Sequence, residues 1–276
     1  MTTEKNLLNF FNESKYYSLK FKNYFPIYEK LFSKYRGKKI TFVEIGVLSG
    51  GSLMMWKNYF GKDARIIGVE LNPEAKKLEN EGFEIYIGNQ SDENFWKTFF
   101  EKIGKVDIVL DDGGHTNFQQ IVTCCSCIPH IKNDGLMVVE DVFHSYGVSY
   151  GSKGFFNPSK YSFINFCKKM IDDINFRFPG NKKFKFSLNK FVYSAEFFES
   201  IVAFNINEIL CETKNEVIFS KGKNFNVKDF AHLHDEKIPG SNKFVIRIKK
   251  IFKSFRGNLK YFVFKINEHV SKKYFR

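Results

Sequence analysis

Short apolar runs alternate with helix-like segments between residues 40 and 140, and this alternation is the main pattern of the chain. The runs lie at 40–45, 65–69, 83–87, 108–110 and 136–139. Each is too short for a helix, and apolar runs of this length between polar turns predict buried strands. Strand and helix repeated five times predict a doubly wound parallel sheet, and therefore an α/β fold.

Segments on either side of this core predict further elements. Residues 4–35 have helical spacing that breaks near Pro26, which predicts two short helices that pack on the sheet as a cover or a dimer contact. Residues 142–157 predict a mobile loop over the ligand-binding edge, and residues 160–176 predict a helix. Further strands are expected at 184–188, 191–193, 201–206 and 216–220, with loop at 221–242. Because some of these strands would add in antiparallel fashion, the sheet should be seven-stranded, mostly parallel and Rossmann-like.

The chain is expected to comprise a helical cover at 1–36, a main domain at 37–242 and a basic tail at 243–276, and charge sets the tail apart. The formal net charge is +13, but the tail holds eleven Lys and Arg against one acid, Glu268. The rest of the chain therefore carries only about +3. A nucleic-acid enzyme should line its active face with basic groups, so this confinement argues against a nucleic-acid partner.

Apolar residues of the tail recur at steps of three or four, so a helix there would carry an apolar stripe beside its basic residues. Three interpretations stay open. The tail would contact an anionic membrane surface or an acidic partner, it would pack against the domain or a second subunit in a homo-oligomer, or it would be disordered.

The cysteines and the N-terminal sequence indicate the cellular compartment in which the protein is expected. Five cysteines, an odd number in no regular framework, predict reduced thiols in a cytoplasmic protein. Cys124 and Cys127 form a CxxC, but no second pair accompanies them, so core packing is favoured over zinc. The N-terminus lacks a signal pattern, and no run approaches the roughly 18 apolar residues of a membrane span. We expect a cytoplasmic protein, peripheral at the inner membrane face if the tail binds lipid.

Acidic residues end both strands of the central strand–helix–strand unit. Asp111 and Asp112 close the first strand, and Glu140 and Asp141 close the second. Ligands bind beyond the carboxyl ends of parallel strands, so both pairs should lie at the same edge. A divalent cation with oxygen ligands would relieve their repulsion, and His115 is a candidate base at the same rim. Alternatively, the acids cap helices or bind a ribose.

The other strand ends suit a nucleoside. The first strand leads into Glu44-Ile-Gly-Val-Leu-Ser-Gly-Gly-Ser52, a Gly-rich turn that lets the backbone approach a ligand. Glu70 ends the second strand, where it would bind ribose hydroxyls or serve as an acid at a helix N-terminus. Asn89 and Gln90 follow the third strand and are placed to reach an adenine edge.

Several of these motifs occur together in one known family. They are Val43-Glu-Ile-Gly-Val-Leu-Ser-Gly-Gly-Ser-Leu, Gly68-Val-Glu-Leu-Asn, Gly88-Asn-Gln-Ser-Asp, Asp111-Asp-Gly-Gly-His, Val139-Glu-Asp, His144-Ser-Tyr and Ser162-Phe-Ile-Asn. In this order and spacing, residues 40–176 resemble class I S-adenosylmethionine-dependent methyltransferases. The specific resemblance is to metal-dependent sugar O-methyltransferases related to macrolide-sugar methylating enzymes, with cephalosporin-hydroxylase-like proteins as neighbours.

The resemblance implies S-adenosylmethionine and Mg²⁺ or Mn²⁺ as cofactors, and a sugar or nucleotide sugar as acceptor. It implies His115 as the base and, as metal ligands, Asp112, Glu140 and Asp141. It places the cofactor against Glu44, Gly46, Ser49, Gly50, Glu70, Asn89, Gln90 and Asp111, and the acceptor near His144 and Tyr146. Family members usually carry Gly-Asp-Gln where this chain has Gly88-Asn89-Gln90, which weakens the case for Asn89.

These implications predict methyl transfer to a sugar hydroxyl, in surface-polysaccharide or nucleotide-sugar biosynthesis. Three alternatives belong to other classes: a methyltransferase with another small-molecule or a nucleic-acid acceptor, a hydroxylase-like protein without methyl transfer, and a non-catalytic binding module. An iron hydroxylase commonly uses two His and one carboxylate, so a carboxylate-rich cluster disfavours it.

Overall fold

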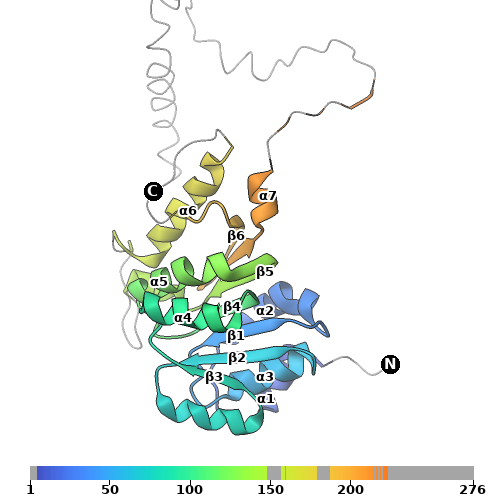
Figure 1. Cartoon of the computed structure of the whole chain (residues 1–276), viewed down its shortest axis with the longest axis vertical. Coiled ribbons are helices and arrows are strands. Elements are labelled where there is room, and N and C mark those ends of the chain that lie inside the picture. Colours follow the sequence, from blue (N-terminus) through green and yellow to red (C-terminus); the bar gives the residue numbers. More distant parts are fainter. Residues whose placement is uncertain are drawn as a thin grey trace, which may run out of the picture. The chain divides into compact units, whose positions relative to one another are not determined.

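The computed structural model describes residues 5–147, 157–158, 160–178, 187–213, 216, 218 and 220–222. Within these ranges seven strands form one sheet (Figure 1). They are β1 Thr41–Ile45, β2 Arg65–Glu70, β3 Glu84–Ile87, β4 Val106–Asp111, β5 Ile131–Val139, β6 Val192–Phe198 and β7 Ile201–Ile206. The order is β3-β2-β1-β4-β5-β7-β6, with β1 to β5 parallel and β7 antiparallel to both neighbours. The predicted mostly parallel, doubly wound, seven-stranded sheet is confirmed.

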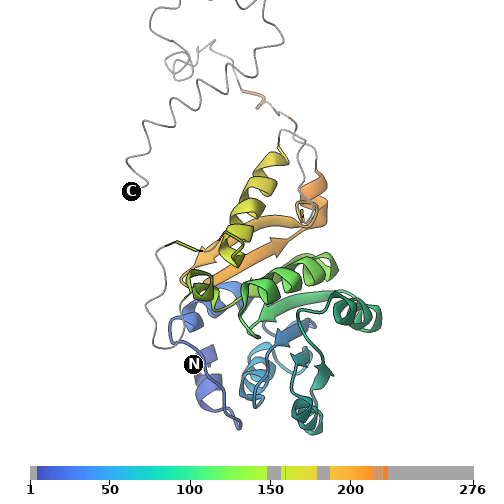
Figure 2. The same ribbon diagram turned by 90° about the vertical axis from the view of Figure 1, so that its left-hand side faces the viewer.

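Helices cover both faces of the sheet (Figures 1 and 2). The α-helices are α1 Leu7–Asn12, α2 Tyr24–Phe32, α3 Gly51–Phe60, α4 Glu93–Ile103, α5 Asn117–Cys127, α6 Phe163–Phe176 and α7 Glu208–Glu212. The 3₁₀-helices are η1 Ser33–Tyr35, η2 Pro73–Glu81, η3 Ile128–His130 and η4 Val142–Tyr146. One core packs α1, α2 and α3 against the sheet, and the other packs α4, α5 and α6.

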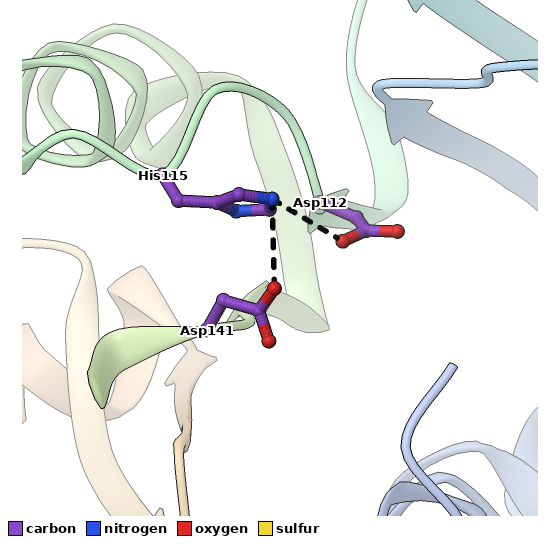
Figure 3. A group of neighbouring side chains, drawn as sticks. All are labelled: Asp112, His115 and Asp141. Atoms are coloured by element: carbon purple, nitrogen blue, oxygen red, sulfur yellow. Dashed lines mark ion pairs between the residues drawn. The ribbon is translucent and has the colours of Figure 1, made fainter. Parts of the chain in front are cut away.

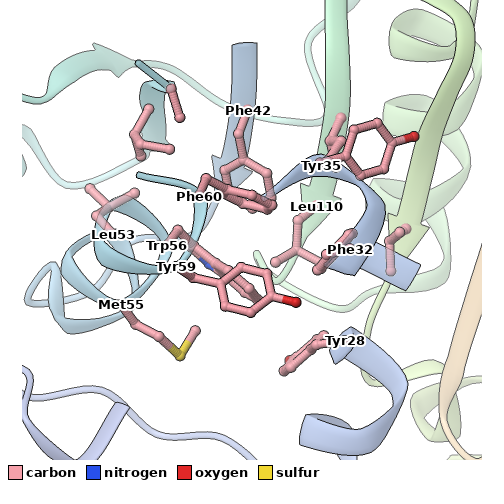
Figure 4. Packing of buried hydrophobic residues seen from close by; sticks show 14 of the residues in the cluster. Tyr28, Phe32, Tyr35, Phe42, Leu53, Met55, Trp56, Tyr59, Phe60 and Leu110 are labelled. Carbon is pink, nitrogen blue, oxygen red and sulfur yellow. The ribbon is translucent and has the colours of Figure 1, made fainter. Parts of the chain in front are cut away.

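Alternate residues of each strand enter opposite cores. Phe42 and Leu110 face the first core, where they meet Phe32, Trp56 and Phe60 (Figure 4). Val43 and Val109, which adjoin them on the same strands, enter the second core. This alternation keeps the parallel strands apolar on both faces, as the sequence runs predicted. Polar side chains are therefore left to the strand ends, where the site lies.

The N-terminal helices differ in detail from their prediction. Pro26 does not break a helix, because α2 begins at Tyr24 and Pro26 lies in its first turn, where a missing N–H is tolerated. Residues 13–23, here called the N-terminal strap, are neither helix nor strand. The strap is held on α3, since the Ser14 hydroxyl donates to the Gly51 carbonyl at 2.8 Å.

The later strands also differ from the apolar runs. β6 is longer than predicted because it continues through half-buried Ser194 and Glu196, which the run at 191–193 did not include. Residues 187 and 188 are not in a strand, nor are 216, 218 and 220, and the rest of the two remaining predicted strands lies outside the described residues. The loop predicted at 142–157 is wrong over Val142–Tyr146, which form the 3₁₀-helix η4, and most of its remainder lies outside the described residues. So do most of the predicted loop at 221–242 and the basic tail at 243–276.

The described residues bear on two predictions, that the cysteines are reduced and that no segment spans a membrane. Cys124 and Cys127 are buried in the second core, and all five cysteines are free thiols. Among the residues described, no helix has the length and apolar character needed to cross a membrane.

Candidate functional site

The carboxyl ends of β4 and β5 bring two acids and a histidine together (Figure 3). Asp112 follows β4, Asp141 follows β5, and His115 lies in the turn before α5. The His115 Nε2 atom is 4.0 Å from Asp112 Oδ1 and 3.5 Å from Asp141 Oδ2. One potential ligand atom from each of the three residues lies within 4.8 Å of the others. This acid–histidine group is therefore compact enough to hold one cation.

The backbone at the group is strained. His115 and Asp141 have φ angles of 56° and 55°, in the left-handed region that residues other than glycine rarely adopt. The His115 Nδ1 atom is buried and has no hydrogen-bond partner among the described residues. Strain of this kind costs about 1–3 kcal/mol per residue and is concentrated at functional sites.

Glu140, the third predicted metal ligand, lies beside this group but has other partners. Its side chain is fully buried, and its Oε1 accepts a hydrogen bond from the Tyr28 hydroxyl at 2.6 Å. Its Oε2 accepts from Lys20 Nζ at 2.9 Å. Burial raises the pKa of the Glu140 carboxyl, and Lys20 opposes that shift. In this structure Glu140 thus connects the site to the N-terminal residues.

Lys20, on the N-terminal strap, is the site residue that sequence reasoning missed. Its side chain is 1% exposed, and its Nζ lies 2.6 Å from Asp112 Oδ2 and 3.7 Å from Glu44 Oε1, in addition to Glu140. Burial lowers the pKa of this ammonium, but the surrounding carboxylates raise it more, so the net pKa is above its ordinary value. Lys20 is therefore a buried cation that balances buried acids.

Two tyrosines of α2 complete the link between the N-terminal residues and the acids. The Tyr24 hydroxyl donates to Asp141 Oδ1 at 2.5 Å, as Tyr28 does to Glu140. Burial and the neighbouring carboxylates raise the pKa of both hydroxyls, so both stay protonated donors. Each predicted metal ligand is thus bonded to a residue between 20 and 28.

A pocket of about 380 Å³ lies next to the acid–histidine group, at the ends of β1, β2 and β3. This Gly-rich pocket is lined by Ser18, Leu19, Ile45, Gly46, Val47, Leu48, Ser52, Val69, Glu70, Leu71, Gly88, Asn89, Gln90, Asp112, Gly113, Gly114, His115, Gln119 and Asp141. Four of the predicted cofactor residues therefore line it, namely Gly46, Glu70, Asn89 and Gln90. The other four, Glu44, Ser49, Gly50 and Asp111, are not among the lining residues.

Glu70 organises the mouth of this pocket. One carboxylate oxygen accepts from the backbone N–H groups of Val47 and Leu48, at 2.9 and 3.3 Å. The other accepts from Leu71 N and Asn72 N at the start of η2. The structure thus brings the acid to the pocket while also giving it the helix-terminal role that the sequence left open.

Two predicted cofactor residues are buried behind the pocket wall. Glu44 accepts from Ser52 Oγ at 2.7 Å and Trp56 Nε1 at 3.0 Å, and its burial raises its pKa to about 7. Burial likewise raises the pKa of Asp111 to about 6. Asp111 Oδ1 accepts from Gln90 Nε2 at 2.9 Å, and its Oδ2 is buried without a partner among the described residues.

Gln90 joins three elements. Besides Asp111, its amide nitrogen donates to Thr123 Oγ1 on α5 at 3.1 Å, and its Oε1 accepts from Gly114 N at 2.7 Å. The Asn89 side chain accepts from Ser91 N at 2.9 Å. Gln90 therefore braces the turn that carries His115, in addition to lining the pocket.

The two residues predicted for the acceptor lie on η4. The His144 ring stacks on the His115 ring, with centroids 5.4 Å apart and planes 2° from parallel. Tyr146 lines a second pocket of about 540 Å³ on the other side of Asp141. This aromatic pocket is lined by Phe21, Asn23, Tyr24, Val142, Phe143, Tyr146, Ile164, Phe197, Phe198, Glu199, Ser200 and Val202.

Comparison with known proteins identifies the domain. Residues 43–142 match the model of a family described as a methyltransferase domain. A similar curated protein is the 8-demethyl-8-(2-methoxy-alpha-L-rhamnosyl)-tetracenomycin-C 3'-O-methyltransferase of Streptomyces olivaceus, 30% identical over 158 residues, or 55% of this chain and 40% of the relative. The mycinamicin VI 2''-O-methyltransferase of Micromonospora griseorubida is 29% identical over 54% of this chain and 39% of its own length. The chain thus spans less than half the length of these relatives.

Solved structures agree with this match. The MycE methyltransferase from the mycinamycin biosynthetic pathway, in complex with Mg, SAH and mycinamycin VI, superposes with a TM-score of 0.66. The match has 22% sequence identity and covers 85% of this chain and 60% of that one. The match of residues 43–142 to a methyltransferase domain and the shared class I fold therefore confirm the predicted resemblance.

Proposed function

We propose that this chain is an S-adenosylmethionine-dependent O-methyltransferase that uses Mg²⁺ or Mn²⁺ to methylate a sugar hydroxyl. The observation that carries the proposal is the acid–histidine group at the wall of the Gly-rich pocket. A methyl group on a sulfonium is already activated, so the protein must supply alignment and a deprotonated oxygen. The pocket suits the first task and the acid–histidine group the second.

The donor set fits a divalent cation. Two carboxylates and an imidazole meet within 4.8 Å, and carboxylate oxygens suit Mg²⁺ and Mn²⁺. We propose Asp112, Glu140 and Asp141 as ligands, with Glu140 shared with Lys20. When bound, the metal supplies Lewis acidity that lowers the pKa of an acceptor hydroxyl. His115 Nε2, which faces both aspartates, takes up the proton.

S-adenosylmethionine is proposed to occupy the Gly-rich pocket. Gly46 and Glu70 would contact it from the ends of β1 and β2, and Asn89 and Gln90 from the end of β3. Four predicted cofactor residues do not line the pocket, and we propose that they shape the turns around it. They are Glu44, Ser49, Gly50 and Asp111. His144 and Tyr146 are proposed to contact the acceptor beyond Asp141.

The acceptor is proposed to be a sugar because the relatives' names specify sugar positions, including a rhamnosyl group. The candidate acceptors are a nucleotide sugar, a surface polysaccharide and a small glycoside. A panel of these three, all carrying L-rhamnose, with S-adenosylmethionine and Mg²⁺, tests the proposal through formation of S-adenosylhomocysteine. If no panel member yields more product than the acceptor-free reaction, sugar methylation is contradicted.

Chelation should abolish this activity. Because the proposed ligands are hard oxygen donors, we expect turnover to vanish in excess EDTA and to return when Mg²⁺ or Mn²⁺ is added above the chelator. The measurement is S-adenosylhomocysteine release before and after metal addition. Undiminished turnover in EDTA would show that the acids serve another purpose.

Replacing Gly46 with Ala should weaken binding of S-adenosylhomocysteine. Gly46 has φ 82°, and a Cβ would lie 2.2 Å from the Asp112 carbonyl oxygen, so the turn after β4 must move. We expect the dissociation constant of S-adenosylhomocysteine, measured by calorimetry, to rise at least about tenfold. The reason is that the displaced turn would strain the pocket wall by ~1–3 kcal/mol.

Gly37→Ala is the matched control for this effect. Gly37 has a similar φ of 68°, but a Cβ there would meet nothing within 4 Å. Both variants should lose stability from the left-handed backbone, and only Gly46→Ala should lose cofactor affinity. Equal affinities in the two variants would remove Gly46 from the proposed cofactor site.

A further inference from the structure

Lys20 bonds two of the three acids that we propose as metal ligands. Its Nζ lies 2.6 Å from Asp112 Oδ2 and 2.9 Å from Glu140 Oε2, and 1% of its side chain is exposed. The other Glu140 oxygen, Oε1, accepts from the Tyr28 hydroxyl at 2.6 Å. Both Glu140 oxygens therefore have a partner before any metal binds. An ion that takes Glu140 as a ligand must draw on an oxygen that Lys20 or Tyr28 already holds.

An ammonium and a divalent cation at the same carboxylates repel each other. Lys20 and Glu140 are buried, so little solvent screens the two positive charges. A carboxylate shared by both cations holds each of them less tightly than it would hold one alone. The divalent ion has the greater charge, and Asp112 Oδ1 and Asp141 Oδ2, which face His115, can hold it as well. The competition therefore favours the metal, and the contacts of Lys20 are the ones that weaken.

Lys20 is also where the strap is tied to the carboxyl ends of the strands. The strap is anchored a second time near its start, where the Ser14 hydroxyl donates to the Gly51 carbonyl and Lys15 pairs with Glu81 at 2.8 Å. The stretch between these anchors is neither helix nor strand. Weakening the contacts of Lys20 should therefore free this stretch, while the first anchor keeps it attached to the domain.

The residues around Lys20 form walls of both pockets. Ser18 and Leu19 line the Gly-rich pocket, and Leu19 is 54% exposed. Phe21, which follows Lys20 in the chain, lines the aromatic pocket. A movement of Lys20 would therefore shift a wall of the pocket in which we propose that the cofactor binds.

We propose that a divalent cation and the Lys20 ammonium compete for Asp112 and Glu140, and that metal binding thereby loosens the strap over the Gly-rich pocket. The strap is then a wall that the metal-free protein holds tightly and the metal-loaded protein holds loosely. This inference rests on the proposed function, because it takes the acids at the ends of β4 and β5 as the metal site.

Hydrogen exchange of the full chain, measured by mass spectrometry with and without Mg²⁺, tests the strap directly. We expect the amides of residues 13–23 to exchange at least about tenfold faster with Mg²⁺, because losing one hydrogen bond to a charged group lowers the free energy of local opening by that much. A ligand that merely stabilises the folded state slows exchange, so the expected change has the opposite sign. Sodium chloride at the same ionic strength is the control for charge screening and should leave the strap unchanged.

Lys20→Met removes the competing ammonium and keeps most of the apolar stem. We expect its Mn²⁺ dissociation constant, measured by electron paramagnetic resonance without acceptor or cofactor, to be at least about tenfold lower than that of the unaltered protein, since a site blocked by its own lysine binds with reduced apparent affinity. The strap of this variant should exchange fast without metal and should not respond to Mg²⁺.

Lys15→Met is the matched control on the same strap. Lys15 is 61% exposed and pairs with Glu81, away from the proposed metal ligands. Its replacement should leave the Mn²⁺ dissociation constant within about twofold of the original, because an exposed charge is largely screened. The strap of this variant should still loosen when Mg²⁺ is added.

The outcomes separate the competition from the proposed reaction. Strap exchange that Mg²⁺ slows or leaves unchanged overturns the inference, and this comparison uses the unaltered protein, so it holds even if Lys20→Met does not fold. Mn²⁺ affinity in Lys20→Met that equals or falls below the original also overturns it. If Mn²⁺ binds to no variant, the proposed metal site fails together with the inference. A loosened strap and tighter Mn²⁺ binding in Lys20→Met support the competition even if no S-adenosylhomocysteine forms in turnover assays, and then only the proposed methyl transfer fails.

Discussion

Replacing Lys20 with Met should destabilise the metal-free protein by about 3–5 kcal/mol, the typical cost of removing one partner from a buried ion pair. Lys20 is the cation at a point where Asp112, Glu140 and Glu44 converge, and the last two are fully buried. Met keeps most of the apolar stem but leaves these carboxylates without a counter-charge. Urea unfolding in EDTA measures the loss.

Added Mg²⁺ should return part of the lost stability to the Lys20→Met variant. A divalent ion that binds the folded state stabilises it by mass action, and it would supply the positive charge that Lys20 no longer provides. The variant should therefore gain more from Mg²⁺ than the unaltered protein gains. An equal gain in both would mean that Lys20 and the metal do not act on the same acids.

The destabilisation should shrink as the pH falls. The pKa of Glu44 is already raised to about 7 by burial, above its value in the unfolded chain. A carboxyl with a raised folded pKa disfavours the folded state above that pKa, and the cost is relieved as protonation proceeds below it. The variant should thus recover stability relative to the unaltered protein between pH 8 and pH 5.5.

Lys15→Met is the control for this experiment. Lys15 lies on the same strap, but its side chain is 61% exposed and pairs with Glu81 at the surface. Exposed pairs of this kind contribute little, so the stability of this variant should stay close to that of the unaltered protein. If Lys20→Met unfolds in EDTA at the same urea concentration as Lys15→Met, Lys20 is not a buried counter-ion.

The contrast between these two lysines shows where sequence reasoning ends. Both lie in a stretch that mixes polar and aromatic residues, and no local pattern distinguishes them. Lys20 becomes a site residue only because the strap crosses the sheet edge and reaches Asp112 and Glu140, which are 92 and 120 positions away in the chain. The sequence did predict repelling acids at one edge, and such acids require a cation. It could not specify which cation supplies the charge.

The elements that the sequence predicted are those marked by a local pattern of apolar residues. The parallel strands are apolar on both faces, so short runs located β1 to β4 within two residues, and the positions of Asp112, His115 and Asp141 followed from the strand ends. β6 was predicted too short because its half-buried edge position admits Ser194 and Glu196. No sequence pattern predicted the aromatic pocket, because Phe21, Phe143 and Phe197 are distant in the chain and are brought together only by the fold.

Replacing His115 with Asn should lower kcat by about 10²–10⁴-fold, the usual contribution of a general base. Asn is the better replacement, because His115 has φ 56° and Asn tolerates this left-handed conformation with less strain than Ala. The binding of S-adenosylhomocysteine, measured by calorimetry, should change little, since Gln90 and Gln119 keep bracing the turn.

His130→Asn is the control. His130 immediately precedes β5 and stacks on Phe100, away from the carboxyl ends of the strands, and kcat should be unchanged there.

The same variant decides whether His115 is a base or a metal ligand, because its Nε2 is close to Asp112 and Asp141 in the same three-residue group. Mn²⁺ affinity, measured by electron paramagnetic resonance in the absence of acceptor, separates the two roles. A base removes a proton from the acceptor and contributes little to metal binding, so the Mn²⁺ dissociation constant of His115→Asn should stay within about twofold of the original. Loss of a ligand would raise it at least about tenfold, since even residues that only support ligands cost 10–100-fold when changed. We expect the first result, because Glu140 lies beside the two aspartates and can supply the third oxygen donor, which leaves the imidazole free to accept the proton.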